Sequence, residues 1–250
     1  MGYVIAMAGK GGTGKTTIAA LIVRIIREKK LGSILTVDAD PNSNFSDLLG
    51  LELKETVGQI IDDIAAHPEK VPSGMSKDRF IEYEIQTAIQ EAEGFDLLVM
   101  GRPEGPGCYC YANNVLRNIM SKLIEDYDYV IIDNEAGLEH LSRRTTRSAN
   151  ALVVVSDATP VGLKAAFRIS DLAKELKIDI KGEFLIVNRY DKNIDIEKLG
   201  KLKSNYLGNI PFDRQVEIKS LDGSSLMELN DNSISLRTLR KLGGKIWGCN

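Results

Sequence analysis

The sequence is poor in the features on which several protein classes depend. Its 250 residues include three cysteines, too few for a disulfide framework, so we expect a reducing compartment such as the cytoplasm. Its longest apolar runs stay well below the about 18 residues that a membrane-spanning helix needs. We expect no secretory leader, because the short apolar stretch at residues 4–7 leads into a glycine loop rather than a cleavage site. These absences predict a cytoplasmic protein without a membrane partner.

The chain also lacks an excess of positive charge. Lys and Arg together number 32 and Asp and Glu number 35, which gives a net charge of −3. Proteins that bind nucleic acid irrespective of its sequence carry a basic surplus, so we expect no nucleic-acid partner. Hydrophobic residues make up 43% and charged residues 27%, a composition that excludes intrinsic disorder. Since no repeat or flexible linker divides the chain, we expect a single domain over residues 1–250.

Short apolar runs alternate with amphipathic stretches along the chain. Such runs are typical of strands that are buried on both faces of a parallel sheet. The stretches between them, such as Thr16–Lys29, carry apolar side chains at helical spacing. This alternation predicts an α/β fold, with a doubly wound, mostly parallel sheet of seven to eight strands flanked by helices. The expected strands are Tyr3–Met7, Ile34–Val37, Phe95–Met100, Tyr129–Ile132, Leu152–Val155, Phe184–Val187 and, more weakly, Leu207–Ile210, and the other expected helices are Asn113–Glu125, Val161–Leu176 and Ile196–Ser204.

The last part of the chain combines apolar and basic side chains at helical spacing. Gly243 and Gly244 interrupt this pattern shortly before Trp247. A basic amphipathic helix can lie on a membrane surface, and that is the alternative interpretation. Because the two glycines break the helix, we expect a closing helix that packs on the sheet.

The strongest motif, G-x-x-x-x-G-K-[ST], covers residues 9–16 and follows the first expected strand directly. In such a P-loop, backbone N–H groups wrap the phosphates of a nucleotide, and the next helix directs its positive end at them. Lys15 is expected to contact the β- and γ-phosphates, and the Thr16 hydroxyl to bind Mg²⁺. The motif therefore predicts a Mg²⁺-dependent hydrolase that binds a nucleotide; the expectation that the nucleotides are ATP and ADP depends on the base-recognition segments described below. The expected nucleotide-binding residues of the loop are Gly9, Lys10, Gly11, Gly12, Thr13, Gly14, Lys15, Thr16 and Thr17.

Three carboxylates follow other expected strands. Asp38 and Asp40 come at the end of the second strand, and Asp133 follows the apolar run of residues 130–132. The carboxyl ends of parallel strands meet at one edge of a sheet, so we expect these side chains near the P-loop. Asp133 is of the Walker B type, which holds Mg²⁺ through water. Any one of these residues alone would also suit a turn or a helix N-cap.

Lys10 distinguishes this P-loop from most others. Residues 10–16 read K-G-G-x-G-K-T and resemble the deviant Walker A family of SIMIBI-class P-loop NTPases, which includes the septum-positioning and partition ATPases (MinD/ParA type) and the nitrogenase iron protein. The resemblance implies that Lys10 reaches across a two-fold homodimer to the partner's phosphates, where charge develops during hydrolysis. It also implies that Asp38 assists the Mg²⁺ shell and that Asp40 orients the attacking water. Lys10, Lys15 and Asp40 are thus the expected catalytic residues, although Lys10 could instead be a solvated loop lysine.

The same resemblance indicates two segments for recognition of the base. Asn188 and the loop Pro211-Phe212-Asp213 match the positions that recognise adenine in this family. Arg189 stands where the guanine signature N-K-x-D has its lysine. ATP is therefore favoured over GTP, and Arg189 is included among the expected nucleotide-binding residues.

Cys108 and Cys110 form a Cys-x-Cys pair in a segment rich in glycine and proline. Two thiolates are half of a tetrahedral site, and a two-fold dimer would supply the other half. Four thiolates suit Zn²⁺ or another thiophilic ion. The alternative is that both cysteines are incidental. Cys249 is assigned no role.

The run Gly101–Cys110, read together with residues 9–17, 38–44 and 133–141, resembles the carbon monoxide dehydrogenase nickel-insertion ATPases (CooC type), including the related acetyl-CoA synthase maturation factor. The resemblance implies a metallochaperone that dimerises on ATP and binds Ni²⁺ or Zn²⁺ through Cys108 and Cys110 of each subunit. Its client would be carbon monoxide dehydrogenase or acetyl-CoA synthase. Two alternatives stay open: a MinD/ParA-like positioning ATPase acting on membrane or DNA, and an iron–sulfur electron carrier resembling the nitrogenase iron protein.

Overall fold

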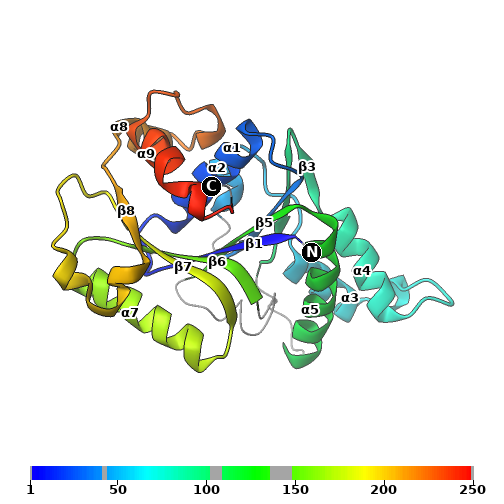
Figure 1. The fold of residues 1–250 in the computed structure, drawn as a ribbon. Helices are drawn as coiled ribbons and strands as arrows, with labels where there is room; N and C mark the ends of the chain where they lie inside the picture. The colour runs from blue at the N-terminus through cyan, green and yellow to red at the C-terminus, as the bar shows by residue number, and fades with distance from the viewer. Residues whose placement is uncertain (1, 41–43, 102–108, 136–147, 249–250) are drawn as a thin grey trace.

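The structure is a computed structural model that describes residues 2–40, 44–101, 109–135 and 148–248. Within these ranges an eight-stranded sheet runs through the molecule in the order β3-β4-β2-β5-β1-β6-β7-β8 (Figure 1). Neighbouring strands are parallel throughout, except that β3 runs antiparallel to β4. The predicted mostly parallel, doubly wound sheet is confirmed.

Each strand predicted from an apolar run is present. The strands are β1 (Tyr3–Ala8), β2 (Ile34–Ala39), β3 (Gln90–Ala92), β4 (Phe95–Val99), β5 (Tyr129–Asn134), β6 (Ser148–Ser156), β7 (Asp179–Asn188) and β8 (Tyr206–Ile210). The helices are α1 (Lys15–Glu28), α2 (Phe45–Leu49), α3 (Val57–Ala66), α4 (Lys77–Thr87), α5 (Tyr109–Asp126), α7 (Pro160–Glu175), α8 (Arg214–Leu221) and α9 (Ile234–Leu242). Short 3₁₀ segments are η1 (Pro68–Lys70), η2 (Ile196–Asn205), η3 (Leu226–Glu228) and η4 (Gly243–Lys245). The predicted helix at residues 196–204 is thus a 3₁₀ segment, broken at Gly200.

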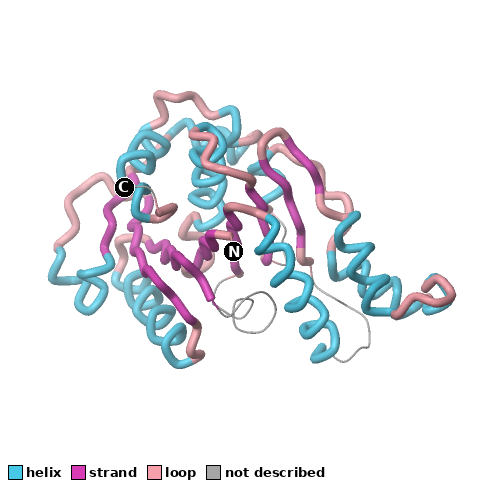
Figure 2. The backbone as a smooth tube through the Cα atoms, turned by 45° about the vertical axis from the view of Figure 1, so that its right-hand side comes forward, coloured by secondary structure: helices cyan, strands magenta, loops and turns pink. Residues whose placement is uncertain are grey.

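Helices cover both faces of the sheet (Figures 1 and 2). Side chains of the central strand β1 alternate between two cores: Ile5 and Met7 pack with α1, α2 and α9, whereas Val4 and Ala6 pack with α3, α4, α5 and α7. Successive residues of a strand point to opposite faces, so a strand covered on both sides must be apolar throughout. This is the physical reason for the continuous apolar runs in the sequence.

The C-terminal segment closes one face of the sheet. Leu236 and Leu239 of α9 and the following Trp247 are each 0% exposed, which confirms the expected closing helix. A Cβ added at Gly243 would lie 1.9 Å from the indole of Trp247, so a glycine is required beneath the ring. The side chains that give this segment its amphipathic pattern are therefore used in the core.

Arg24 fastens the C-terminal part of the chain to α1. Its side chain is buried, and its Nη1 donates to the carbonyl oxygens of Leu226, at 3.2 Å, and Leu229. Its Nε donates to Glu28 Oε1 at 2.6 Å. Since α1 begins at the P-loop, this network connects the nucleotide-binding motif to the closing segment.

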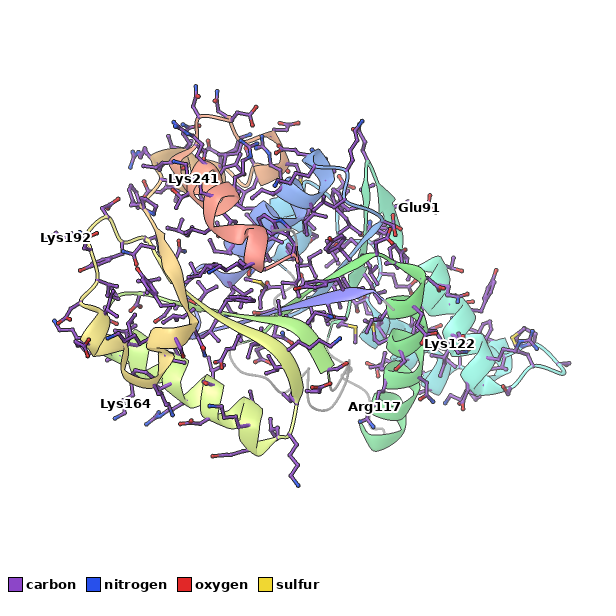
Figure 3. All side chains as sticks on the ribbon, in the orientation of Figure 1. Glu91, Arg117, Lys122, Lys164, Lys192 and Lys241 are labelled. Carbon is purple, nitrogen blue, oxygen red and sulfur yellow. The ribbon has the colours of Figure 1, made fainter. Side chains whose placement is uncertain are left out.

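Most charged side chains of the described residues lie at the periphery of the molecule, in contrast to the buried Arg24. Figure 3 shows Glu91, Lys164, Lys192 and Lys241 pointing outward, and all four are exposed. Over the part of the chain that the structure describes, none of the helices has the length and apolar character needed to cross a membrane.

Candidate nucleotide-binding site

The P-loop joins β1 to α1 at the carboxyl edge of the sheet. Gly9 and Gly14 have φ values of 152° and 91°, a region that side chains disfavour. A Cβ at Gly9 would lie 2.2 Å from the carbonyl oxygen of Val155, and one at Gly14 would lie 2.3 Å from Nδ2 of Asn188. Both glycines are therefore required by conformation and by close packing.

The two lysines of the loop differ in their surroundings. Lys15 is 7% exposed at the start of α1, whereas Lys10 is exposed at the surface. The backbone N–H and the hydroxyl of Thr13 both donate to the Lys10 carbonyl, at 3.3 and 2.8 Å, so the loop is closed on itself. The N-cap residue Gly14 provides no side-chain hydrogen bond to α1. First-turn N–H groups of α1 are thus left for an anion such as a phosphate.

Asn188 and Arg189, at the end of β7, hold the P-loop backbone. The buried Asn188 donates from Nδ2 to the Thr13 carbonyl at 2.9 Å. Arg189, which has a positive φ of 56°, donates from Nη2 to the Gly12 carbonyl. Asn188, predicted to recognise the base, and Arg189, predicted to bind the nucleotide, therefore hold the backbone of the P-loop in place.

A cavity of about 230 Å³ lies beside the P-loop. Its walls come from α1, from the loop after β8 and from α8. All five nucleotide-binding residues that were predicted outside the P-loop line it, namely Asn188, Arg189, Pro211, Phe212 and Asp213. Gly14 and Thr17 of the phosphate loop also line it, so the cavity continues directly from the phosphate site. Ile18, Leu21 and Val216 make much of the wall apolar, as is usual for small-molecule pockets.

The wall formed by α8 was not predicted from the sequence. Val216, Glu217, Ser220 and Leu221 of this helix line the cavity. Its eight residues have little amphipathic pattern, and none is buried. The usable signal was Asp213, whose side chain caps the helix by accepting the Gln215 N–H at 2.9 Å.

The Asp213 carboxylate forms hydrogen bonds within the protein. Its Oδ2 accepts the hydroxyl of Ser233 at 2.5 Å and the backbone N–H of Ser235 at 3.0 Å. Burial acts to raise the pKa of Asp213, but the hydrogen bonds from Ser233, Ser235 and Gln215 outweigh it and lower the pKa. Asp213 thus fastens the base loop to the start of α9.

Asp38 and Asp133 lie opposite each other on the adjacent strands β2 and β5. They are 0% and 1% exposed. Burial raises the pKa of Asp38 to about 7, and the nearby Asp133 charge contributes to this increase. Burial raises the pKa of Asp133 to about 6, although the Thr16 hydroxyl and the Lys15 charge act against it. Two acidic groups are therefore held in a desolvated position next to the P-loop.

The residues around Asp133 fit a magnesium ion. Asp133 Oδ1 is buried and has no hydrogen-bond partner among the described residues. The Thr16 hydroxyl is hydrogen-bonded to the same carboxylate. An unpaired buried carboxylate oxygen is costly, and a hard cation with oxygen ligands relieves that cost. The structure thus brings together Thr16 and Asp133, with Asp38 and Asp40 close by.

The Cys-x-Cys pair lies mostly outside the described residues. Cys108 is not among them, and of Cys110 only the backbone, in the first turn of α5, is described. Among the residues that are described, no three or more His, Cys, Asp or Glu side chains gather as metal ligands. The thiolate site predicted from the sequence stays a prediction.

The chain is similar to ATP-binding proteins over most of its length. The AAA domain family (AAA_31) matches residues 2–186. The ATP-binding protein MJ0685 of Methanocaldococcus jannaschii is 41% identical over 97% of this chain and 98% of that protein. The carbon monoxide dehydrogenase accessory protein CooC of Rhodospirillum rubrum is 28% identical over 90% of each chain.

The fold is also found in a solved structure. The septum site-determining protein MinD of Pyrococcus horikoshii, complexed with Mg-ADP, superimposes with a TM-score of 0.71 over 98% of this chain and 96% of that chain. The two sequences are 22% identical, so the similarity concerns the fold. It confirms the predicted MinD-like P-loop NTPase architecture.

Proposed function

Since this chain belongs to the AAA domain family and is a P-loop ATPase, we propose that it is an ATP-dependent metallochaperone for a nickel enzyme. The observation that supports this most directly is the similarity to CooC over 90% of both chains. The Cys-x-Cys pair, Cys108 and Cys110, offers the thiolates that such a cargo needs. The metal is thus the cargo of the protein.

The proposed ATP site uses the residues gathered at the carboxyl edge of the sheet. The P-loop binds the phosphates, Lys15 contacts the β- and γ-phosphates, and the cavity beside α8 takes the base. Thr16 and Asp133 would hold Mg²⁺, which when bound neutralises phosphate charge. Asp40 orients the attacking water. Two observations support these roles: Lys15 is buried at the start of α1, and Asp133 Oδ1 has no hydrogen-bond partner in the part of the chain that the structure describes.

The proposed cargo site needs two copies of the chain. Lys10, exposed on the P-loop, completes the ATP site of the partner. Cys108 and Cys110 from each subunit supply four thiolates to one Ni²⁺ or Zn²⁺ ion. ATP favours the closed dimer, and hydrolysis opens it so that nickel passes to carbon monoxide dehydrogenase or acetyl-CoA synthase. We propose that residues 1–250 act as one domain in the cytoplasm.

The cysteines provide the sharpest test of the cargo. Cys108→Ala and Cys110→Ala should each abolish metal binding, because two thiolates in a dimer hold a thiophilic ion far less tightly than four. Cys249→Ala is the matched control and should keep one ion per two chains. Each protein is incubated with Ni²⁺ and a non-hydrolysable ATP analogue, then separated by size, and the metal content of each peak is measured. Wild-type metal content in the Cys108 and Cys110 variants would refute the cargo site, while ATP affinity should stay unchanged in all three.

A positioning ATPase that acts on membrane or DNA is the second candidate function. It is favoured by the shared fold with a septum site-determining MinD protein. Co-sedimentation with anionic liposomes and with DNA, each with and without ATP, separates the two candidates. A metallochaperone stays in the supernatant in every case, whereas ATP-dependent pelleting would support the positioning function.

A further inference from the structure

Both carboxylate oxygens of Asp38 accept a hydrogen bond from a backbone N–H group. Its Oδ1 accepts the N–H of Asp40 at 3.1 Å, and its Oδ2 accepts the N–H of Phe45 at 3.0 Å. The backbone of Asp38 is also fixed, since its carbonyl accepts the N–H of Met100 at 2.8 Å. Asp38 therefore connects β2 to the backbone of Asp40 and to the first residue of α2.

The bond to Phe45 replaces a cap that α2 otherwise lacks. N–H groups in the first turn of a helix have no helical acceptor. Asn44, at the N-cap position, provides no side-chain hydrogen bond to α2, and Phe45 itself is 0% exposed. Hydrogen bonds from backbone N–H groups to an ionised carboxylate are among the stronger ones in proteins. The Asp38 side chain thus stabilises the local backbone at the start of α2.

Asp133 presents the opposite arrangement. It lies directly across from Asp38 in the sheet, yet its Oδ1 has no partner among the described residues. The Asp40 charge, in addition to burial, raises the pKa of both Asp38 and Asp133, so its carboxylate is close to both. Of the two opposed carboxylates, Asp133 therefore has an oxygen without a partner among the described residues, whereas each oxygen of Asp38 already accepts a backbone N–H.

We propose that Asp38 is a positioning residue for Asp40 and lies outside the Mg²⁺ shell. By holding the Asp40 N–H, it sets the place of the Asp40 carboxylate at the ATP site. The inference rests on the proposed function, in which Asp40 orients the attacking water. It departs from the role that the family resemblance implied for Asp38.

A double-mutant cycle tests the proposal. Asp38→Asn should lower kcat about 100-fold, the effect expected when a catalytic group is misplaced by about 1 Å, and Asp40→Asn, which removes the catalytic carboxylate itself, should lower kcat at least as much. The double variant should be at most about twofold slower than Asp40→Asn alone, because a positioning residue has no effect once its target is gone. The Mg²⁺ concentration for half-maximal activity should stay within about twofold of wild type in Asp38→Asn. In Asp133→Asn, the matched control on the opposite strand, it should rise at least about tenfold.

Two outcomes would overturn the proposal alone: recovery of kcat by Asp38→Asn at saturating Mg²⁺, or effects that multiply in the double variant. Wild-type kcat in Asp40→Asn would overturn both the proposed role of Asp40 and this inference. Amide hydrogen exchange of nucleotide-free wild type gives a readout that requires no variant to fold. The N–H groups of Asp40 and Phe45 should exchange slowly, and exchange at the rate of unstructured amides would refute the hydrogen bonds that the proposal needs.

Discussion

At the residue scale, Asp38 and Asp133 face each other in the sheet, and they destabilise the folded protein when both carboxylates are ionised. Burial raises their pKa values to about 7 and about 6, well above the value of about 3.9 for an aspartate in an unfolded chain. Between pH of about 4 and 7 the folded protein therefore binds more protons than the unfolded chain. Stability from these two groups is greatest when they are protonated and falls as the pH rises.

We expect the urea midpoint of the nucleotide-free, Mg²⁺-free protein to fall as pH rises from about 5 to about 7.5. Asp133→Asn should flatten this slope, because it removes one of the two titrating groups. Asp128→Asn is the control: hydrogen bonds from Ser33 lower the pKa of this exposed carboxylate, so its titration lies outside the range. A midpoint that rises with pH in the wild type, or an unchanged slope in Asp133→Asn, would contradict the prediction.

The position of the site could be predicted from the sequence more accurately than the role of each side chain. The P-loop could be predicted from its motif, Asp133 from its place at the carboxyl end of a parallel strand, and the cavity residues 211–213 from their match to positions of a resembled family. Asn188, Asp213 and Asp38 were expected to serve ligands, yet each makes hydrogen bonds to nearby backbone. Spacing cannot separate these uses, since the same amide and carboxylate atoms serve both.

At the element scale, α8 stands apart from the helices that form the two cores. It buries none of its eight residues, whereas α1 alone buries ten. Leu221 at its end is 78% exposed and lines the cavity beside the P-loop, together with Phe212, which is 43% exposed. When a ligand covers apolar side chains that are exposed around a pocket, the apolar surface removed from water stabilises the complex. We infer that the nucleotide base packs against α8.

Leu221→Ser should weaken ATP binding roughly tenfold, the loss of about 1.4 kcal/mol of apolar contact. Leu53→Ser is the matched control, because Leu53 is also exposed, at 46%, but lies away from the cavity. Isothermal titration with ATP and with tripolyphosphate measures both effects. Tripolyphosphate affinity should be the same in all proteins, since it has no base. Equal ATP affinity in the two variants would exclude α8 from the base site.

Elements with long apolar runs or long amphipathic stretches were predicted, whereas shorter ones were missed, including α2, α3 and α4, which bury apolar side chains in the two cores. Strands such as β6 are covered on both faces, so their apolar runs are continuous and distinctive. The three-residue β3 and the polar α8 bury little and leave no such pattern. The segment at residues 196–204 has helical spacing, but Gly200, with a φ of 47°, breaks it into 3₁₀ turns.

At the scale of the whole molecule, the strand order gathers distant parts of the sequence at one edge. The central β1 ends in the P-loop, and its neighbour β5 ends beside Asp133. On the other side β7 brings Asn188 to the P-loop backbone. Lys10 is exposed at this edge, which is the position required for contact with a second copy of the chain.

Lys10→Ala should abolish the ATP-dependent dimer and lower kcat by about 1,000-fold or more, the effect of losing a cation supplied across an interface. ATP binding by the single chain should persist, because Lys15 is retained. Lys164→Ala is the control, because Lys164 is also an exposed lysine but lies on α7 rather than in the P-loop. This variant should still dimerise. Light scattering with a non-hydrolysable ATP analogue measures the mass of each protein. A Lys10→Ala protein that dimerises normally would refute the cross-subunit role.

The two outer strands of the sheet bear on how this protein resists aggregation. One border is β3, which has three residues, runs against its neighbour and carries the exposed Glu91. The other is β8, whose pairing with β7 contains a register shift. Short, charged or irregular borders are poor templates for the addition of another chain's strand. At high protein concentration, these edge strands should therefore resist pairing with strands of other copies, which is the step by which β-sheet fibrils grow.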